Sequence, residues 1–349
     1  MRAIKLFEVG DADQLTLVDV PVPVPRAGQI LVRVEAAGVT FAETVERAGR
    51  GFPGLVLPAV YGSEIAGTVE SLGPDTTGPA VGTRVVVPFI LPNGMWTKGG
   101  YAEFALADPR YAAPLPDAVS SAESVTLLSQ GLTAYLMLHK AIQVRKGETV
   151  LVHSAAGGVG GIIVQLARLL GAGPVIGTAS TEAKRKYVSD LGADVVLDSR
   201  SVDWPAQVLE ATGGTGASLI FEATGGEEGR RNLQCLAPYG RMVVYGFASG
   251  SLFQINPEEF LQLLFKNQSI VGFGSFDWLT DASIVRGILQ ALIDLAASGQ
   301  LKLPTVEFPL EEAAAAHRAL EDRSVVGKVA LVPSMPSSLG SHKECVARL

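Results

Sequence analysis

Small residues fill a seven-residue segment whose backbone could hold a phosphate group. The segment is Ser154-Ala155-Ala156-Gly157-Gly158-Val159-Gly160. It follows the apolar run 150–152 and precedes residues 161–170, where apolar side chains recur at helical spacing. A strand, a glycine turn and a helix in this order present backbone N–H groups to a pyrophosphate with no Cβ in the way. The segment therefore predicts a dinucleotide site, and the simpler alternative is a plain turn between a strand and a helix.

Residues beyond the next apolar run indicate which nicotinamide cofactor would bind. A Rossmann fold selects NAD with an acid about 20 residues after the glycines. Ala179 and Ser180 occupy that place here, and Lys184 and Arg185 follow them. A neutral donor beside cations suits a 2′-phosphate, which predicts NADPH. The alternative is that Ser180 only caps a helix and Lys184 is a solvated helix residue.

The cysteines and histidines are too few and too scattered to suggest a metal site. The chain has two cysteines, Cys235 and Cys345, and four histidines, which are His139, His153, His317 and His342. A lone histidine is more often a packing or surface residue than a ligand. We therefore expect no metal and no disulfide framework.

Strands and helices alternate around the glycine turn. Apolar runs at 150–152, 175–178, 195–197, 219–222, 241–245 and 269–272 read as strands, with helices at 181–191, 204–211, 230–236 and 257–265 between the later ones. Alternation at this spacing predicts a parallel sheet of about six strands, the number in a complete dinucleotide fold.

The two ends of the chain have a different sequence pattern. Short strands with Gly and Pro turns before residue 120 predict a barrel-like β domain. After Gly274 the alternation stops, and two helices (282–297 and 310–320) precede a strand at 329–332, which we expect to return to the first domain. Residues 333–349 are polar and non-periodic, as in a loose tail.

Composition excludes several classes of partner. The 349 residues carry a formal net charge of −7 with scattered Lys and Arg, so nucleic acid is not expected. The N-terminus lacks a signal-peptide core, and no uncharged run reaches the ~18–20 residues of a membrane span. A cytoplasmic protein with no membrane partner is the expectation.

Several segments together resemble the zinc-free quinone oxidoreductase (zeta-crystallin-like) branch of the medium-chain dehydrogenase/reductase superfamily. The matching segments are residues 58–69 (PAVYGSEIAGTV), 99–103 (GGYAE), 131–134 (GLTA), 155–165 (AAGGVGGIIVQ), 236–241 (LAPYGR) and 327–329 (GKV). The resemblance covers residues 1 to about 332 in the family's order.

The resemblance implies an α/β chain with two domains. A six-stranded Rossmann NADPH-binding domain would span 124–273. A GroES-like β-barrel-type catalytic domain would form from both ends of the chain, 1–123 and 274–332, with the tail at 333–349.

The resemblance also implies a site without zinc. Zinc relatives take a ligand from the histidine of a G-H-E segment, which reads Gly62-Ser63-Glu64 here. Their cysteine position falls near 38–40, and no cysteine is there. A serine hydroxyl is a poor zinc ligand, so reduction of an activated acceptor suits this site better than alcohol oxidation.

By resemblance, the cofactor would contact one set of residues and the acceptor another. Arg200 could replace a family tyrosine at the 2′-phosphate. The expected cofactor-binding residues are Thr133, Ala156, Gly157, Gly158, Val159, Gly160, Ser180, Lys184, Arg200, Tyr245, Gly246, Phe247, Phe273, Ser275 and Arg323. Thr40 and Tyr61 are the catalytic candidates. Thr40 replaces the family's asparagine, and Val45 replaces a tyrosine that some relatives carry, for which Tyr61 is a substitute because it adjoins the substrate-side segment. The alternative for Tyr61 is a packing or cleft-wall residue. Glu43 replaces the family's aspartate.

We therefore expect an NADPH-dependent reductase that transfers hydride to a quinone or an α,β-unsaturated carbonyl. One alternative is a stand-alone enoyl-thioester reductase acting on CoA or carrier-protein substrates. A second is an NADPH-binding protein with little turnover. Relatives pair through a sheet edge, so residues 269–273 predict a homodimer.

Overall fold

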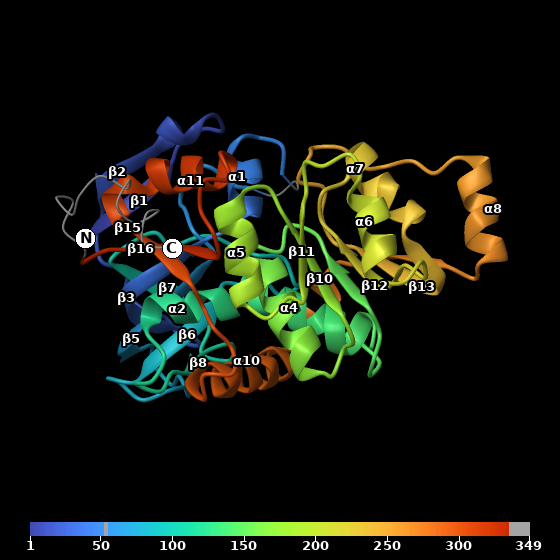
Figure 1. Cartoon of the computed structure of the whole chain (residues 1–349). Coiled ribbons are helices and arrows are strands. Elements are labelled where there is room, and N and C mark those ends of the chain that lie inside the picture. The colour runs from blue at the N-terminus through green and yellow to red at the C-terminus, as the bar shows by residue number, and fades with distance from the viewer. Residues whose placement is uncertain (52–54, 335–349) are drawn as a thin grey trace. The chain divides into compact units, whose positions relative to one another are not determined.

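The computed structural model describes residues 1–51 and 55–334 and divides into two compact units (Figure 1). Among the described residues, the outer unit comprises Met1–Leu132 and residues 275–334, and the central unit comprises Thr133–Gly274. The first division falls within helix α3 (Ser129–Leu136), later than the expected boundary at 123/124, and the second adjoins the expected one at 273/274. Most of the expected tail, residues 335–349, lies outside the described part of the chain.

The central unit is built on a six-stranded parallel sheet in the order β11-β10-β9-β12-β13-β14. Its strands are β9 (Val150–Val152), β10 (Val175–Ala179), β11 (Val195–Asp198), β12 (Ala217–Glu222), β13 (Leu236–Val244) and β14 (Ser269–Gly272). Its helices are α4 (Gly158–Leu169), α5 (Glu182–Asp190), α6 (Trp204–Ala211), α7 (Gly226–Arg230) and α8 (Pro257–Phe265). Counted from β9, the order is 3-2-1-4-5-6, so the predicted Rossmann fold is confirmed.

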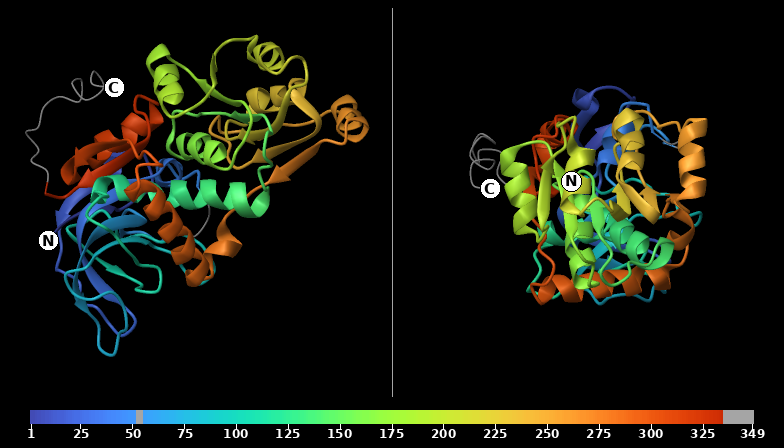
Figure 2. Two further views of the ribbon diagram at one scale, coloured as in Figure 1. Left: turned by 60° about the horizontal axis from the view of Figure 1, so that its bottom comes forward. Right: turned by 45° about the vertical axis from the view of Figure 1, so that its right-hand side comes forward.

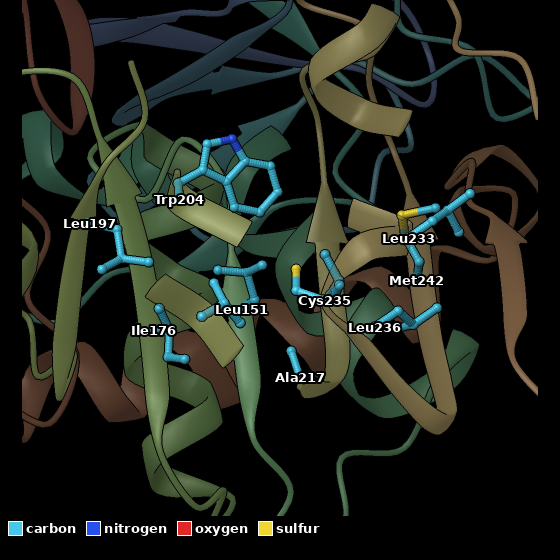
Figure 3. Close-up of a cluster of buried hydrophobic side chains, with 11 residues drawn as sticks. Leu151, Ile176, Leu197, Trp204, Ala217, Leu233, Cys235, Leu236 and Met242 are labelled. Carbon is cyan, nitrogen blue, oxygen red and sulfur yellow. The ribbon is translucent and has the colours of Figure 1, made fainter. Parts of the chain in front are cut away.

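Helices cover both faces of this sheet (Figure 2). On one face α5 packs so closely that a Cβ on Gly177 would lie 2.6 Å from Cγ1 of Val188. On the other face Trp204 and Val208 of α6 join a buried cluster with Leu151 and Ile176 (Figure 3). Apolar residues on both sides of each strand are what a doubly covered parallel sheet requires.

One predicted element is partly wrong. The sequence predicts a helix over 230–236, but α7 ends at Arg230, a 3₁₀ turn covers Arg231–Gln234, and Leu236 already belongs to β13. Strand β13 pairs with β12 at Leu236 opposite Ala217 and next at Arg241 opposite Leu219, so the ladder is irregular over 237–240. Pro238 and Gly240 lie in this irregular stretch and interrupt the strand pattern in the sequence.

The outer unit contains two sheets. A three-stranded sheet has the order β2-β1-β4, and a seven-stranded sheet has the order β15-β16-β3-β5-β6-β8, with β7 paired to β3. The strands are β1 (Arg2–Leu6), β2 (Leu15–Asp19), β3 (Ile30–Val39), β4 (Ala59–Val60), β5 (Glu64–Leu72), β6 (Arg84–Pro88), β7 (Phe104–Ala107), β8 (Ala113–Pro114), β15 (Thr305–Pro309) and β16 (Lys328–Val332). Strand β16 lies antiparallel to β3, with Val329 opposite Val39, so the predicted return of the chain to its first sheet is observed.

Helices of the outer unit come from both ends of the chain. They are α1 (Phe41–Arg47), α2 (Ser121–Ser124), the first half of α3, α9 (Phe276–Leu279), α10 (Ala282–Ala297) and α11 (Ala313–Glu321). Within residues 1–51 and 55–334, no helix combines the length and the apolar character needed to cross a membrane.

Candidate cofactor and active site

The glycine turn opens α4 with its first backbone amides available to a ligand. Gly157 is the N-cap, and among the described residues no side chain caps this helix. A Cβ on Gly160 would lie 2.5 Å from the carbonyl oxygen of Ser154, so only glycine lets the helix pack this closely against the turn. Uncapped amides at the positive end of a helix dipole form an anion site. The residues present therefore fit a pyrophosphate.

Ser180 lies one residue beyond β10, at the carboxyl edge of the sheet. The N-cap of α5 is Thr181, whose Oγ1 accepts the N–H of Lys184 at 3.3 Å, so capping is not the role of Ser180. Lys184 and Arg185 both belong to the start of α5. Arg200 forms an ion pair with Asp198, at 3.3 Å between Nε and Oδ1. Hydroxyl and cationic groups thus gather at the place where a Rossmann fold meets the adenosine ribose.

A buried polar chain, which the sequence did not reveal, lies directly behind the glycine turn. Nε2 of His153 lies 2.7 Å from Oδ1 of Asn232, and Nδ1 lies 3.2 Å from Oγ1 of Thr178. The amide of Asn232 also donates to Oε2 of Glu222 at 2.7 Å, and Oε1 of Glu222 accepts the N–H of Gly225 at 2.7 Å. These groups tie together the carboxyl ends of β9, β10 and β12, and buried polar groups satisfied in this way fix one local geometry.

The expected nicotinamide neighbours divide between the two units. Tyr245, Gly246 and Phe247 follow β13 and Phe273 follows β14, so these residues lie at the carboxyl ends of neighbouring strands. Backbone hydrogen bonds hold them there, from Tyr245 N–H to Glu222 at 3.0 Å and from Phe273 N–H to Val244 at 2.9 Å. Thr133 is also in the central unit, whereas Ser275, Arg323 and the catalytic candidates Thr40 and Tyr61 belong to the outer unit. Their joint action on one cofactor stays a prediction.

Glu43 is the centre of the polar site in the outer unit. Its Oε2 accepts the N–H of Thr40 at 2.9 Å, and Thr40 Oγ1 accepts the N–H of Glu43 at 3.2 Å, which forms a capping box at the start of α1. Ser63 donates its hydroxyl to Oε1 at 2.8 Å, and Tyr101 donates to Oε2 at 2.9 Å. Thr40, Glu43 and Ser63 are therefore parts of one buried network. The T-x-x-E spacing is the sequence signal of such a cap.

The charge state of Glu43 follows from these contacts. Burial raises the pKa of this carboxyl, but the Lys98 ammonium, the Thr40 N–H and the Ser63 hydroxyl help to outweigh burial, so the pKa lies below its usual value. An ionised Glu43 can only accept hydrogen bonds. The single hydroxyl proton of Ser63 is therefore committed to Glu43, in the position where zinc relatives present an imidazole nitrogen.

His317 closes the network from α11. Its Nε2 lies 3.1 Å from the hydroxyl oxygen of Tyr101, which already donates to Glu43, so Nε2–H is the donor. Nδ1 of His317 is buried and has no hydrogen-bond partner within the described chain. Burial lowers the pKa of His317 to about 4, so the imidazole is neutral at neutral pH. The sequence gives no local signal for the contact between His317 and Tyr101, because the two residues lie far apart in the chain.

The hydroxyl group of Tyr61 lies beside Glu43 and Glu46 in the outer unit. The group donates to the backbone carbonyl of Glu43 at 2.8 Å and lies 3.0 Å from Oε2 of Glu46, and the side chain is fully buried. The Nζ atom of Lys98 lies 5.0 Å from the ring centroid. Burial, Glu43 and Glu46 raise the pKa of Tyr61 well above its usual value. These contacts favour a packing role, and proton donation by Tyr61 stays a prediction.

Glu64, next to Ser63, forms a second buried charge cluster with Lys328. The two side chains are in direct contact and both are fully buried. The ammonium of Lys328 also donates to the carbonyl of Val39 at 3.1 Å and to Oε1 of Gln130 at 2.9 Å, and Glu64 Oε2 accepts the N–H of Ser129 at 2.9 Å. Lys328 is the first residue of β16, so β16 supplies the cation for a buried carboxylate of β5.

Fold and site together define a class of protein: a nucleotide-dependent oxidoreductase with a Rossmann unit and a second catalytic unit formed from both ends of the chain. Family models agree with this class. Residues 26–117 match the alcohol dehydrogenase GroES-like domain, and residues 158–295 match the zinc-binding dehydrogenase domain. In the part of the chain that the structure describes, no group of three or more His, Cys, Asp or Glu side chains could hold a metal ion.

Individual relatives narrow the class. The chain is 34% identical over 341 residues to a 2-haloacrylate reductase from Burkholderia sp., covering 95% of this chain and 99% of that one. It is 35% identical over 337 residues to the quinone oxidoreductase of Rattus norvegicus, covering 95% and 98%. The solved structure of Escherichia coli quinone oxidoreductase complexed with NADPH has a TM-score of 0.86 at 30% identity, covering 95% and 100%. The chain belongs to the zinc-free quinone oxidoreductase branch of the medium-chain dehydrogenase/reductase superfamily.

Proposed function

We propose that this protein is a zinc-independent, NADPH-dependent reductase that transfers hydride to a quinone or an α,β-unsaturated carbonyl. The observation that carries the proposal is the carboxyl edge of the central sheet. There the N-terminus of α4 at Gly157 has no side-chain cap among the described residues. The neighbouring strand β10 ends at Ala179 and is followed by Ser180, not by an acid, and α5 then supplies Lys184 and Arg185. The names of the relatives support the acceptor class, because quinones and haloacrylates are both electron-poor and conjugated.

The residues of the chain would bind and orient, and NADPH when bound would supply the hydride. The amides of the α4 N-terminus would hold the pyrophosphate, and Ser180 with Lys184 and Arg200 would hold the 2′-phosphate. In the outer unit Thr40 Oγ1 accepts a hydrogen bond from Glu43, which leaves its own hydroxyl proton for an acceptor oxygen. Water can protonate a reduced quinone, so no side-chain acid is required for that acceptor.

A spectrophotometric panel tests this proposal. NADPH and NADH oxidation would be followed with free quinones, 2-enals, 2-haloacrylates and enoyl thioesters as acceptors, and zinc would be measured in the same preparation. We expect preference for NADPH, turnover of free quinone or enone, and substoichiometric zinc. A preference for NADH would contradict the assignment of Ser180 and Lys184. One zinc per chain would contradict the assignment of Ser63.

An enoyl-thioester reductase is the second candidate, and one relative favours it. The chain is 33% identical over 338 residues to one polypeptide of the phenolphthiocerol/phthiocerol polyketide synthase of Mycobacterium tuberculosis, and the match covers 94% of this chain and 14% of that protein. The panel separates the two activities, because a thioester enzyme prefers the CoA-linked or carrier-linked enoyl acceptor over free quinone. Tight NADPH binding without turnover of any acceptor would instead indicate a cofactor-binding protein.

We further propose a homodimer formed through the edge of the central sheet, in the cytoplasm. Strand β14 is the edge strand, and α8 just before it exposes Phe260 (57%), Leu264 (58%) and Phe265 (74%). An exposed apolar helix beside an open strand edge is typical of a protein interface. Light scattering should give a dimer mass, and Leu264→Lys should give a monomer. The matched control is Leu169→Lys, at a leucine that is 44% exposed on α4.

A further inference from the structure

Two guanidinium groups converge on one carboxylate at the carboxyl edge of the central sheet. Asp198 ends β11, and its register partner is Ala179, the residue before Ser180. Nη1 of Arg185 lies 3.1 Å from Asp198 Oδ2. From the other side, Arg200 approaches with Nε at 3.3 Å from Oδ1 and Nη2 at 3.4 Å from Oδ2. The carboxylate therefore occupies an anion site built from two arginines.

Asp198 is held as an anion at this position. The backbone N–H of Arg200 donates to its Oδ1 at 2.9 Å, and this bond together with the Arg200 guanidinium holds the pKa of Asp198 below its usual value. The N–H of Ser199 donates to the carbonyl of Ala179 at 3.1 Å, which fixes the turn after β11 beside the end of β10. Asp198 is thus a fixed negative charge next to Ser180.

The contact with Asp198 leaves a donor of Arg185 without a hydrogen bond among the described residues. Its Nη1 is buried and close to Asp198, yet among the described residues it makes no hydrogen bond of acceptable geometry. Arg185 is the fourth residue of α5, and helical side chains lean toward the N-terminus, where Thr181 and Ser180 lie. A guanidinium with an unmet donor therefore lies beside Asp198, whose register partner Ala179 directly precedes Ser180.

We propose that Arg185 grips the 2′-phosphate of NADPH and that Asp198 stands in for this phosphate when the cofactor is absent. The inference rests on the proposed use of NADPH. A partly exposed ion pair contributes little to stability, so Arg185 can leave Asp198 at small cost. A phosphate dianion offers a guanidinium two acceptor oxygens and more charge than one carboxylate. Asp198 accordingly competes with the cofactor for both arginines.

Removing the charge of Asp198 changes cofactor affinity in a different way for each role that this residue could have. If Asp198 is a stand-in, removing its charge frees both guanidinium groups and tightens NADPH binding. If Asp198 instead positions Arg185 for the phosphate, removing its charge weakens NADPH binding. If it accepts the ribose hydroxyls of NADH, removing its charge weakens NADH binding.

Binding titrations on the full chain without acceptor decide between these roles. Cofactor fluorescence would give Kd for NADPH and NADH in the wild type, R185Q and D198N. The control is R168Q, which removes a comparable ion pair at the opposite end of β11, with 2.9 Å between Arg168 Nη1 and Asp194 Oδ2. Wild-type NADPH binding tests the proposed function itself, and NADH binding reports that each variant is folded.

We expect the ratio of Kd for NADPH to Kd for NADH to rise about tenfold in R185Q, the effect of losing one charged hydrogen bond. In D198N the ratio should fall about two- to fivefold, and in R168Q it should equal the wild-type ratio. An unchanged ratio in R185Q, a raised ratio in D198N, or a selective loss of NADH binding in D198N would overturn the inference. Each of these results leaves NADPH use by the wild type intact.

Discussion

Replacing Lys328 with methionine should strongly destabilise the outer unit. Methionine keeps most of the volume of the lysine stem but removes the ammonium that contacts Glu64, Gln130 and Val39. Glu64 is fully buried, and among the described residues its carboxylate then keeps one hydrogen bond, from the N–H of Ser129 at 2.9 Å. The substitution therefore leaves a buried carboxylate without its cation.

The expected loss is about 3–5 kcal/mol of unfolding free energy, the usual cost of breaking a buried ion pair from one side. A double substitution, Lys328→Met with Glu64→Gln, removes both charges and should cost at least about 1 kcal/mol less than the single substitution. The single variant should also be less impaired at pH 5 than at pH 7. Burial raises the pKa of Glu64, and without Lys328 the buried carboxyl takes up a proton more readily as the pH falls.

Urea unfolding of the wild type, both single variants and the double variant at pH 7 and pH 5 measures these quantities. Circular dichroism follows the transition of the whole chain. A K328M variant within about 1 kcal/mol of the wild type, or a double variant less stable than K328M, would contradict a stabilising role of Lys328 toward Glu64.

Three further substitutions probe the site. Gly160→Val should weaken NADPH binding at least about tenfold in a fluorescence titration, because even a Cβ would lie 2.5 Å from the Ser154 carbonyl, whereas Gly287→Ala on α10 has open space and should bind normally. His317 has a pKa of about 4 in the folded chain against 6.5 ordinarily, so the folded state binds fewer protons, and stability should fall as pH drops from 6.5 to 4, by up to about 3 kcal/mol. His317→Gln should flatten that decline in urea unfolding, and an equal slope would speak against it. Ser63→Ala should cost about 1 kcal/mol by removing one donor from Glu43; no measurable cost would contradict the hydrogen bond.

The central unit could be predicted from the sequence because each of its elements carries its own local signal. Apolar runs such as Val150–Val152 and Val175–Ala179 form fully buried strands, and glycines mark the turn where backbone approaches backbone. Local sequence signals gave a wrong prediction at 230–236, where a helix was expected. Strand β13 begins at Leu236 and includes Pro238 and Gly240, and its pairing with β12 stabilises it. Pairing between strands depends on residues that are distant in the sequence, so a short segment alone does not predict it.

The site in the outer unit was only partly predictable, for the same physical reason. Thr40 and Ser63 are identifiable by resemblance, and the capping box to Glu43 has a local spacing. Lys328 and His317, in contrast, reach this region from far along the chain, 264 residues from Glu64 and 216 from Tyr101. Contacts over such separations are set by the order of strands β16, β3 and β5, which the composition of either segment alone does not encode.

The place of β16 between β15 and β3 has a consequence for synthesis on the ribosome. The central unit is one uninterrupted segment, Thr133–Gly274, so its sheet can form while the later residues are still being synthesised. The seven-stranded sheet must wait for residues 328–332, which supply both a strand and the cation for Glu64. Until then the Ala37–Val39 end of β3 lacks its partner strand and Glu64 lacks its cation, so the nascent N-terminal segment is exposed to aggregation.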